Sequence, residues 1–174
     1  MPSGGFNSLE VEAQIRKIVV ADNSGIVMET ETLLYIAGLA QKVGEHIIPA
    51  LEKYEVVIVD RFILSILVIV CYMNKLDKEF ANSILAYVSQ GIKPDFTYLC
   101  DIDEEIAYDR MIKRGKPLSR REKKGIPLMR VLREGFLESI SKTTKHFKII
   151  DTGKVSLQEI DKYIYGIEEY FENE

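Results

Sequence analysis

The amino-acid sequence predicts an α/β protein in which a parallel β-sheet is flanked by helices. Short β-branched or aromatic runs recur at residues 56–59, 96–100 and 147–150, and such runs are typical of buried strands. Longer segments with helical spacing of apolar residues separate them, and strands that alternate with helices form parallel sheets. The chain has 174 residues, enough for one domain with a substantial core. We therefore expect residues 1–174 to form a single domain.

The first half of the chain predicts two helical segments before the first strand. An amphipathic pattern of apolar residues runs to about residue 19 and predicts a helix. Asn7 and Ser8 stand just before it, and both residue types cap helices well. A turn at residues 22–25 follows. Residues 29–54 have the pattern of one long helix, in which Pro49 predicts a kink or a new turn.

The remaining elements follow from the same two periodicities. Residues 56–59 predict a buried parallel strand, and two helices follow at about 62–74 and 77–91. After a break at Gly91 and Pro94, we expect a strand at 96–100, a helix at 103–114, a loop at 114–126, a helix at 127–144 and a strand at 147–150. An acidic helix from residue 157 ends the chain.

The composition excludes several functional classes. A net charge of −4 gives no reason to expect nucleic acid or a membrane surface as a partner. The most apolar run, residues 63–72, is shorter than the roughly 20 residues that span a bilayer, and no signal peptide is recognisable. We therefore expect a cytoplasmic protein. Cys71 and Cys100 are interpreted as buried thiols, and two isolated histidines argue against a histidine metal site.

Each predicted strand ends in an aspartate, at Asp60, Asp101 and Asp151. Ligands of parallel sheets bind beyond the carboxyl ends of the strands. For Asp101 and Asp151, helix capping or turn formation is the simpler interpretation. Asp60 is followed directly by Arg61, and this pair could hold Mg²⁺ or its water shell and bind a phosphate with two N–H groups. By composition alone, an ion pair that ends the strand explains the pair equally well.

A cluster of cations lies between the predicted helices at 103–114 and 127–144. From residue 110 to 124 the chain carries eight cations, against the single acid Glu122: Arg110, Lys113, Arg114, Lys116, Arg120, Arg121, Lys123 and Lys124. Such a cluster would attract polyphosphate. The alternative is a solvated helix end and loop.

Five short motifs of the sequence resemble those of the thymidylate kinase family, and they occur in the family's order. The first is Pro2-Ser3-Gly4-Gly5, like the family's Glu-Pro-Gly-Gly loop. The others are Glu31-Thr32-Leu33-Leu34-Tyr35-Ile36-Ala37, Asp60-Arg61-Phe62-Ile63-Leu64-Ser65, Gly91-Ile92-Lys93-Pro94-Asp95 and Arg133-Glu134-Gly135-Phe136-Leu137-Glu138. The resemblance extends over nearly the whole chain.

The resemblance implies a fold like that of P-loop nucleoside monophosphate kinases, and the reaction of ATP with dTMP that gives dTDP and ADP. It implies that Arg61 binds the phosphate of the acceptor nucleotide and that Asp60 organises Mg²⁺ and the acceptor, so both are predicted to be catalytic. Tyr35 matches the aromatic residue that stacks on thymine, although a core aromatic is the simpler interpretation from composition. Ser65, Gly4 and Gly5 are also expected at the substrate.

The resemblance also assigns the basic loop at about residues 114–126 to the lid over ATP. Arg120 matches the lid arginine that steadies the transferring phosphoryl group, so it is predicted to be catalytic and to contact the cofactor. Arg110 and Arg114 are predicted to bind the same nucleotide. The family's helical dimer implies a homodimer, for which the apolar helices at 29–53 and 63–74 are candidates, although their apolar residues could equally be core.

The largest departure from the family is an absent motif. The sequence contains no Gly-x-x-x-x-Gly-Lys-Ser/Thr, the phosphate loop that cradles the donor phosphates. In the family this loop follows a first, central strand, so the resemblance implies a fold whose first strand is missing. Without the loop's amides we do not expect this chain alone to transfer phosphate at a useful rate. We expect a truncated form of a longer kinase, with a naturally short paralogue as the alternative.

The acceptor site departs from the family as well. The arginine that contacts thymine in the family falls on Leu39, and its Tyr-Gln pair falls on Ile69 and Val70. The lid's Asp-Arg pair reads Ser119-Arg120. Lost polar contacts weaken base selection. Two alternatives to a dTMP kinase therefore stay open: an inactive kinase-like paralogue that binds nucleotide or pairs with an active subunit, and a kinase for another nucleotide or nucleoside.

Overall fold

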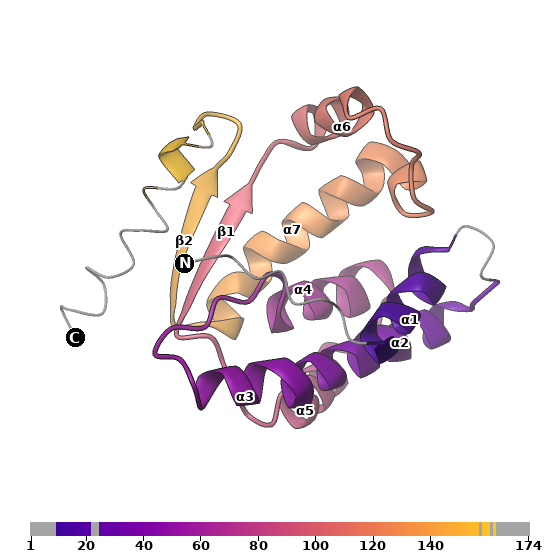
Figure 1. The fold of residues 1–174 in the computed structure, drawn as a ribbon. Coiled ribbons are helices and arrows are strands. Elements are labelled where there is room, and N and C mark those ends of the chain that lie inside the picture. Colours follow the sequence, from indigo (N-terminus) through magenta and orange to yellow (C-terminus); the bar gives the residue numbers. More distant parts are fainter. Residues whose placement is uncertain (1–9, 22–24, 157, 161, 163–174) are drawn as a thin grey trace.

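The computed structural model describes residues 10–21, 25–156, 158–160 and 162. Strands β1 (Phe96–Asp101) and β2 (His146–Asp151) pair in parallel, from Phe96 opposite His146 to Asp101 opposite Asp151. The long helix α7 (Gly125–Thr143) lies along both strands (Figure 1). Its N-terminal end follows the chain segment that lies beyond the carboxyl ends of β1 and β2. The predicted α/β fold with helices on a parallel sheet is confirmed.

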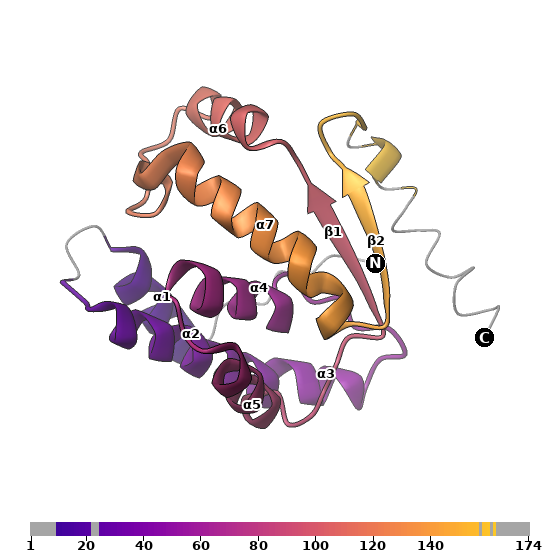
Figure 2. The same cartoon turned by 180° about the vertical axis from the view of Figure 1, so that it is seen from behind.

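Five helices lie on the other side of α7 from the strands (Figure 1), with the bounds α1 Glu10–Val20, α2 Met28–Lys42, α3 Ile48–Leu51, α4 Ile63–Val68 and α5 Lys78–Val88. Helix α6, Glu104–Lys113, lies beyond the carboxyl end of β1 and packs against α7. Figure 2 shows α4 between α7 and the pair formed by α1 and α2, with α5 beneath. Of the last predicted helix, residues 158–160 and 162 are helical, and the rest lies outside the described residues.

Pro49 interrupts the long helix at residues 29–54 as predicted. A π-helical turn, Val43–Ile47, separates α2 from α3, and Pro49 occupies the start of α3. Proline has no N–H and its ring clashes with the carbonyl four residues before it. The wider π turn accommodates that ring while the chain keeps its helical direction.

The hydrophobic core lies between α2, α4 and α5 and the π-helical turns that extend α2 and α4. It consists of Ile36, Leu39, Val43, Ile47, Leu67, Val70, Cys71, Ala81 and Leu85, all of them buried. One buried polar pair crosses this region, in which Asn74 donates from Nδ2 to Thr32 Oγ1 at 2.9 Å. Both residues are buried, so each needs the other as a hydrogen-bond partner. Their bond holds the first turns of α2 against the end of the π-helical turn Ile69–Met73 that follows α4.

Two expectations about the first strand and the cysteines are wrong. Residues 56–59 form no strand, because no described segment pairs with them, and Val56 and Ile58 are 58% and 73% exposed. A β-branched run indicates strand propensity, but a strand needs a hydrogen-bonded neighbour to form. Cys71 is buried as expected, whereas Cys100 on β1 is exposed.

Candidate functional site

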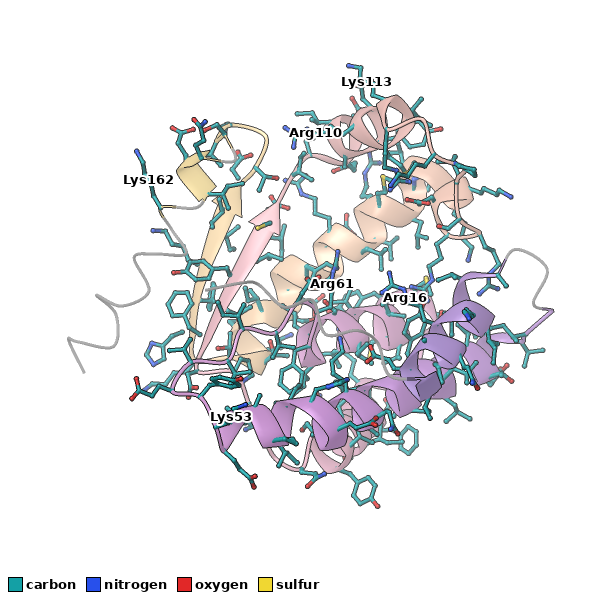
Figure 3. The ribbon with its side chains drawn as sticks, viewed as in Figure 1. Arg16, Lys53, Arg61, Arg110, Lys113 and Lys162 are labelled. Carbon is teal, nitrogen blue, oxygen red and sulfur yellow. The ribbon has the colours of Figure 1, made fainter. Side chains whose placement is uncertain are left out.

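The Asp60-Arg61 pair lies immediately before α4. Both side chains are exposed, and Arg61 has a φ of 62°, which costs a non-glycine residue roughly 1–2 kcal/mol. Its guanidinium lies 5.9 Å from the centre of the Phe136 ring on α7. In Figure 3, Arg61 lies near the centre of the view, away from Arg110 and Lys113 on α6. A strained, exposed arginine is typical of a functional site.

Asp60 is the only predicted metal ligand. Among the described residues, no three His, Cys, Asp or Glu side chains form a cluster that could hold a metal ion. Mg²⁺ commonly keeps several waters and takes one or two carboxylates together with substrate phosphates. The exposed carboxylate of Asp60 fits that pattern, in which substrate and water oxygens complete the coordination.

Ser65 lies in the first turn of α4, and its side chain is 7% exposed. Its N–H donates to the Phe62 carbonyl at 3.0 Å, so the helix start fixes its position relative to Arg61. Gly4 and Gly5, the other residues predicted at the substrate, lie outside the described residues.

The lid segment, residues 114–126, reaches across to α2 and meets Tyr35. Glu31 on α2 is 5% exposed, and its Oε1 accepts hydrogen bonds from Arg120 Nη2 and, at 3.1 Å, from Arg121 Nη2. The Arg121 guanidinium lies 4.3 Å from the centre of the Tyr35 ring, within the range of a cation–π interaction. We call Glu31, Tyr35, Arg120 and Arg121 the lid cluster. It joins two predicted sites, 89 residues apart in the chain.

The electrostatics of the lid cluster follow from its burial. Burial raises the pKa of Tyr35, and the positive charge of Arg121 partly offsets that effect. The tyrosine therefore stays neutral at physiological pH, and its ring presents an apolar face with a hydroxyl group. A neutral aromatic face of this kind can stack on a nucleobase or a guanidinium.

The other predicted lid cations bind within their own part of the molecule. Arg114 donates from Nη2 to Glu122 Oε1 at 2.8 Å, and the N–H of Ser119 donates to Glu122 Oε2 at 2.8 Å. These two donors, the Ser119 N–H above all, lower the pKa of Glu122 to about 2. Arg110 donates to the Thr152 carbonyl at 3.1 Å, which links α6 to the turn after β2. Arg110 and Arg114 thus pair with groups that do not belong to the lid cluster.

The sequence analysis missed an ion-pair network at the carboxyl end of β1. Arg133 on α7 binds Asp101 with two hydrogen bonds of 2.8 and 2.9 Å and Glu104 with one of 2.9 Å. These partners raise the pKa of Arg133, Asp101 most strongly. Asp101 therefore neither caps a helix nor forms a turn. Asp103 caps α6 instead, and Asp151 accepts from the Gly153 N–H in a turn.

Two further features were not predicted. Arg16 on α1 (Figure 3) is exposed and has no ion pair among the described residues; the local sequence, in which Lys17 follows it directly, does not single it out. A cavity of about 140 Å³ lies between α4, α5 and α7, lined by Cys71, Tyr72 and Lys78 among others. None of the predicted site residues lines this cavity, so it does not belong to the candidate site.

The sequence matches known proteins over most of its length. The sequence model of the thymidylate kinase family matches residues 7–164. The chain belongs to the thymidylate kinase family. The thymidylate kinase of Carboxydothermus hydrogenoformans is 35% identical over 153 residues, which cover 88% of this chain and 73% of that protein.

Other thymidylate kinases also match most of the chain. That of Caldanaerobacter subterraneus subsp. tengcongensis is 34% identical over 160 residues, 92% of this chain and 76% of that protein. That of Staphylococcus haemolyticus is 28% identical over 138 residues, which cover 79% of this chain and 68% of that protein. In the described part of this family member, no helix is both long and apolar enough to cross a lipid bilayer.

Proposed function

We propose that this thymidylate kinase family member carries the acceptor-nucleotide site and the lid of an enzyme that phosphorylates dTMP to dTDP with ATP. The observation that carries the proposal is the lid cluster. A loop predicted to cover the donor nucleotide binds the helix predicted to hold the acceptor base, through Glu31 and Tyr35. Phosphoryl transfer depends mainly on positioning and charge neutralisation, and a lid that closes on the acceptor helix provides both.

The proposed roles follow from charge and exposure. Arg61 is exposed and has no carboxylate partner among the described residues, so it is available to bind the acceptor phosphate. Ser65, one turn into α4, supports the same site, and Tyr35 provides a stacking surface for the base. When bound, Mg²⁺ neutralises the charge on the phosphates, and Asp60 is the carboxylate that would hold it.

The lid residues are proposed to act on the donor side. Arg120 would steady the transferring phosphoryl group. For this role its guanidinium must leave the Glu31 carboxylate and bind phosphate oxygens instead. A phosphate carries more charge than a carboxylate, and guanidinium pairs well with both. Arg110 and Arg114 are proposed contacts of ATP, and Gly4 and Gly5 of the substrate. The 174 residues contain no phosphate-loop motif, and none of the residues proposed here replaces its amides.

The first experiment measures dTMP binding to the 174-residue chain by calorimetry, with thymidine as the ligand that lacks phosphate. Arg61→Ala should weaken dTMP binding about 10- to 100-fold, as expected for losing a charge-assisted contact, and should leave thymidine binding unchanged. Lys93→Ala removes an exposed cation from the turn before β1 and serves as the control. No dTMP binding by the unmodified chain would contradict the proposed function.

The second experiment measures ATP-dependent dTMP phosphorylation by this chain alone and by a version fused to a strand, phosphate loop and helix of a family member. We expect turnover only in the fused protein. Binding of dTMP without turnover in either protein would instead favour an inactive, nucleotide-binding paralogue. A substrate panel on the fused protein tests other nucleoside monophosphates as acceptors.

We further propose a cytoplasmic homodimer. Leu33 on α2 is 59% exposed and Leu51 on α3 is 49% exposed, so the helices at 29–53 retain apolar surface for a partner subunit. The apolar residues of the segment at 63–74 are different, because Leu67, Val68 and Val70 are buried in the core. Light scattering of Leu33→Glu should give a lower mass than the unmodified chain, and an unchanged mass would argue against this interface.

A further inference from the structure

The accessible face of the Tyr35 ring is already occupied by the lid. Tyr35 is half-buried and packs against the hydrophobic core, so little of its ring is left for other contacts. The Arg121 guanidinium lies over that ring, 4.3 Å from its centre, which is contact distance. A nucleobase stacks on an aromatic ring at a similar separation. The guanidinium and a base therefore cannot occupy this face of Tyr35 together.

Glu31 holds the guanidinium in this position. Its carboxylate is 5% exposed and accepts hydrogen bonds from Nη2 of both Arg120 and Arg121. Removing the partners of a buried carboxylate is strongly unfavourable. The two ion pairs therefore keep the lid on the helix that carries Tyr35, and we call them the Glu31 latch.

The Glu31 latch also has an internal cost. The Nε–H groups of Arg120 and Arg121 are buried and have no acceptor among the described residues. A buried donor without an acceptor is unfavourable, and both donors would gain water as a partner if the lid moved away. The ion pairs and the unpaired donors thus oppose each other. A ligand that competes for the face of Tyr35 can therefore release the lid at a reduced cost.

Glycines near both ends of the lid permit such a movement. Gly115 has a φ of 67° and Gly125 a φ of 66°, in the left-handed region that strains other residues. An added methyl group at Gly115 would meet nothing within 4 Å, so this turn is not packed against a neighbour. Lids commonly move about a few loop positions of this kind. The chain between the two glycines carries both arginines of the Glu31 latch.

We propose that Arg121 is an autoinhibitory plug of the acceptor-base site, and that Glu31 keeps it there. This inference rests on the proposed function, because that function places the base on Tyr35. The base displaces the Arg121 guanidinium from the ring when it binds. Arg120 is the neighbour of Arg121 in the chain and shares the Glu31 carboxylate, so the same movement frees Arg120 for phosphate oxygens. The acceptor in this way prepares the lid for the donor nucleotide.

The first test is an NMR titration of the 174-residue chain with dTMP and with 2-deoxyribose 5-phosphate, which carries the phosphate but no base. Arg121→Ala should bind dTMP about three- to tenfold more tightly than the unmodified chain, because no guanidinium has to leave the ring. Its affinity for 2-deoxyribose 5-phosphate should stay unchanged. The loss of a cation by itself weakens the binding of an anion, so tighter binding has the opposite sign. Lys93→Ala removes an exposed cation outside the lid and should change neither affinity.

The second test is limited digestion of the lid with trypsin, which cleaves after lysine and arginine. Proteolysis of a segment that opens and closes rapidly follows the population of its open form. Saturating dTMP should therefore speed cleavage within residues 114–124 of the unmodified chain severalfold. Glu31→Gln keeps the size of the side chain but loses its charge, so its lid should be cleaved at the faster rate without dTMP. Circular dichroism checks that this variant is folded.

The outcomes separate the plug from the function on which it rests. Weaker or unchanged dTMP binding by Arg121→Ala, with 2-deoxyribose 5-phosphate binding unchanged, would overturn the inference. Protection of the lid from trypsin by dTMP would overturn it as well. In both cases dTMP binding by the unmodified chain and its weakening by Arg61→Ala would still support the proposed function. If neither the unmodified chain nor Arg121→Ala binds dTMP, both proposals fail.

Discussion

Gly135, in the middle of α7, allows this helix to approach the segment after α4. A methyl group at this position would lie 2.7 Å from Tyr72 Cγ and 3.0 Å from both Tyr72 Cδ2 and Val68 Cγ1. Carbon atoms pack best at about 3.5–4.0 Å, so Gly135→Ala requires both neighbours to move. Tyr72 resists this movement, because its hydroxyl is hydrogen-bonded to Lys78 and Ser139.

The expected magnitude follows from two opposing effects. Overpacking a core typically costs about 1–3 kcal/mol, and two side chains on another element must shift here. Replacing glycine by alanine in a helix gains about 0.8–1.0 kcal/mol. The net effect is a loss, so we expect Gly135→Ala to lower the free energy of unfolding by up to about 2 kcal/mol. Because α7 also carries Phe136 beside Arg61, dTMP affinity should fall as well.

Urea unfolding followed by circular dichroism measures the change, with Gly44→Ala as the matched control. Gly44 is also helical, but an added methyl group there would meet nothing within 4 Å. Its replacement should raise the free energy of unfolding by about 0.5–1 kcal/mol. If both variants are stabilised to the same extent, α7 does not depend on the close approach at Gly135.

Two further predictions concern the lid and the core. The folded pKa of Glu122 is about 2, below the ordinary value of 4.5, so its stabilising contact is present above about pH 4.5 and is lost as the pH falls towards 2. In urea unfolding, the difference in stability between Glu122→Gln and the unmodified chain should therefore become smaller as the pH is lowered from 5 to 3. A difference that stays constant over this range would contradict the role given to the Glu122 carboxylate. Asn74→Ala should cost about 1–2 kcal/mol by removing the buried bond to Thr32. A double-mutant cycle with Thr32→Val measures their coupling, and additive effects would refute it.

Much of the fold and of the family assignment was predictable from local patterns. Helices α1, α2, α5, α6 and α7 lie where apolar spacing predicted them, and β1 and β2 lie where the β-branched and aromatic runs stand. These features depend on neighbours three or four residues away in helices and two in strands. The order of short motifs was enough to indicate the family that the comparison then established.

The candidate site was only partly predictable, because its contacts join distant segments. Arg120 and Arg121 stood out as cations, but nothing in their local sequence indicated that Glu31 would bind both. Likewise, the position of Asp101 at the end of a strand suggested a helix cap or a turn, whereas its carboxylate binds Arg133 on α7. Such pairings depend on which helix faces meet, which is decided by packing over the whole core.

The sequence by itself determined the helices, the two paired strands and the chemical types gathered at the site. The tertiary structure alone decided that residues 56–59 remain unpaired, that Cys100 is exposed and that the lid reaches α2. The physical reason is the same in each case. Periodicity is a local property of the chain, whereas pairing and burial depend on which other segments are available as neighbours in space.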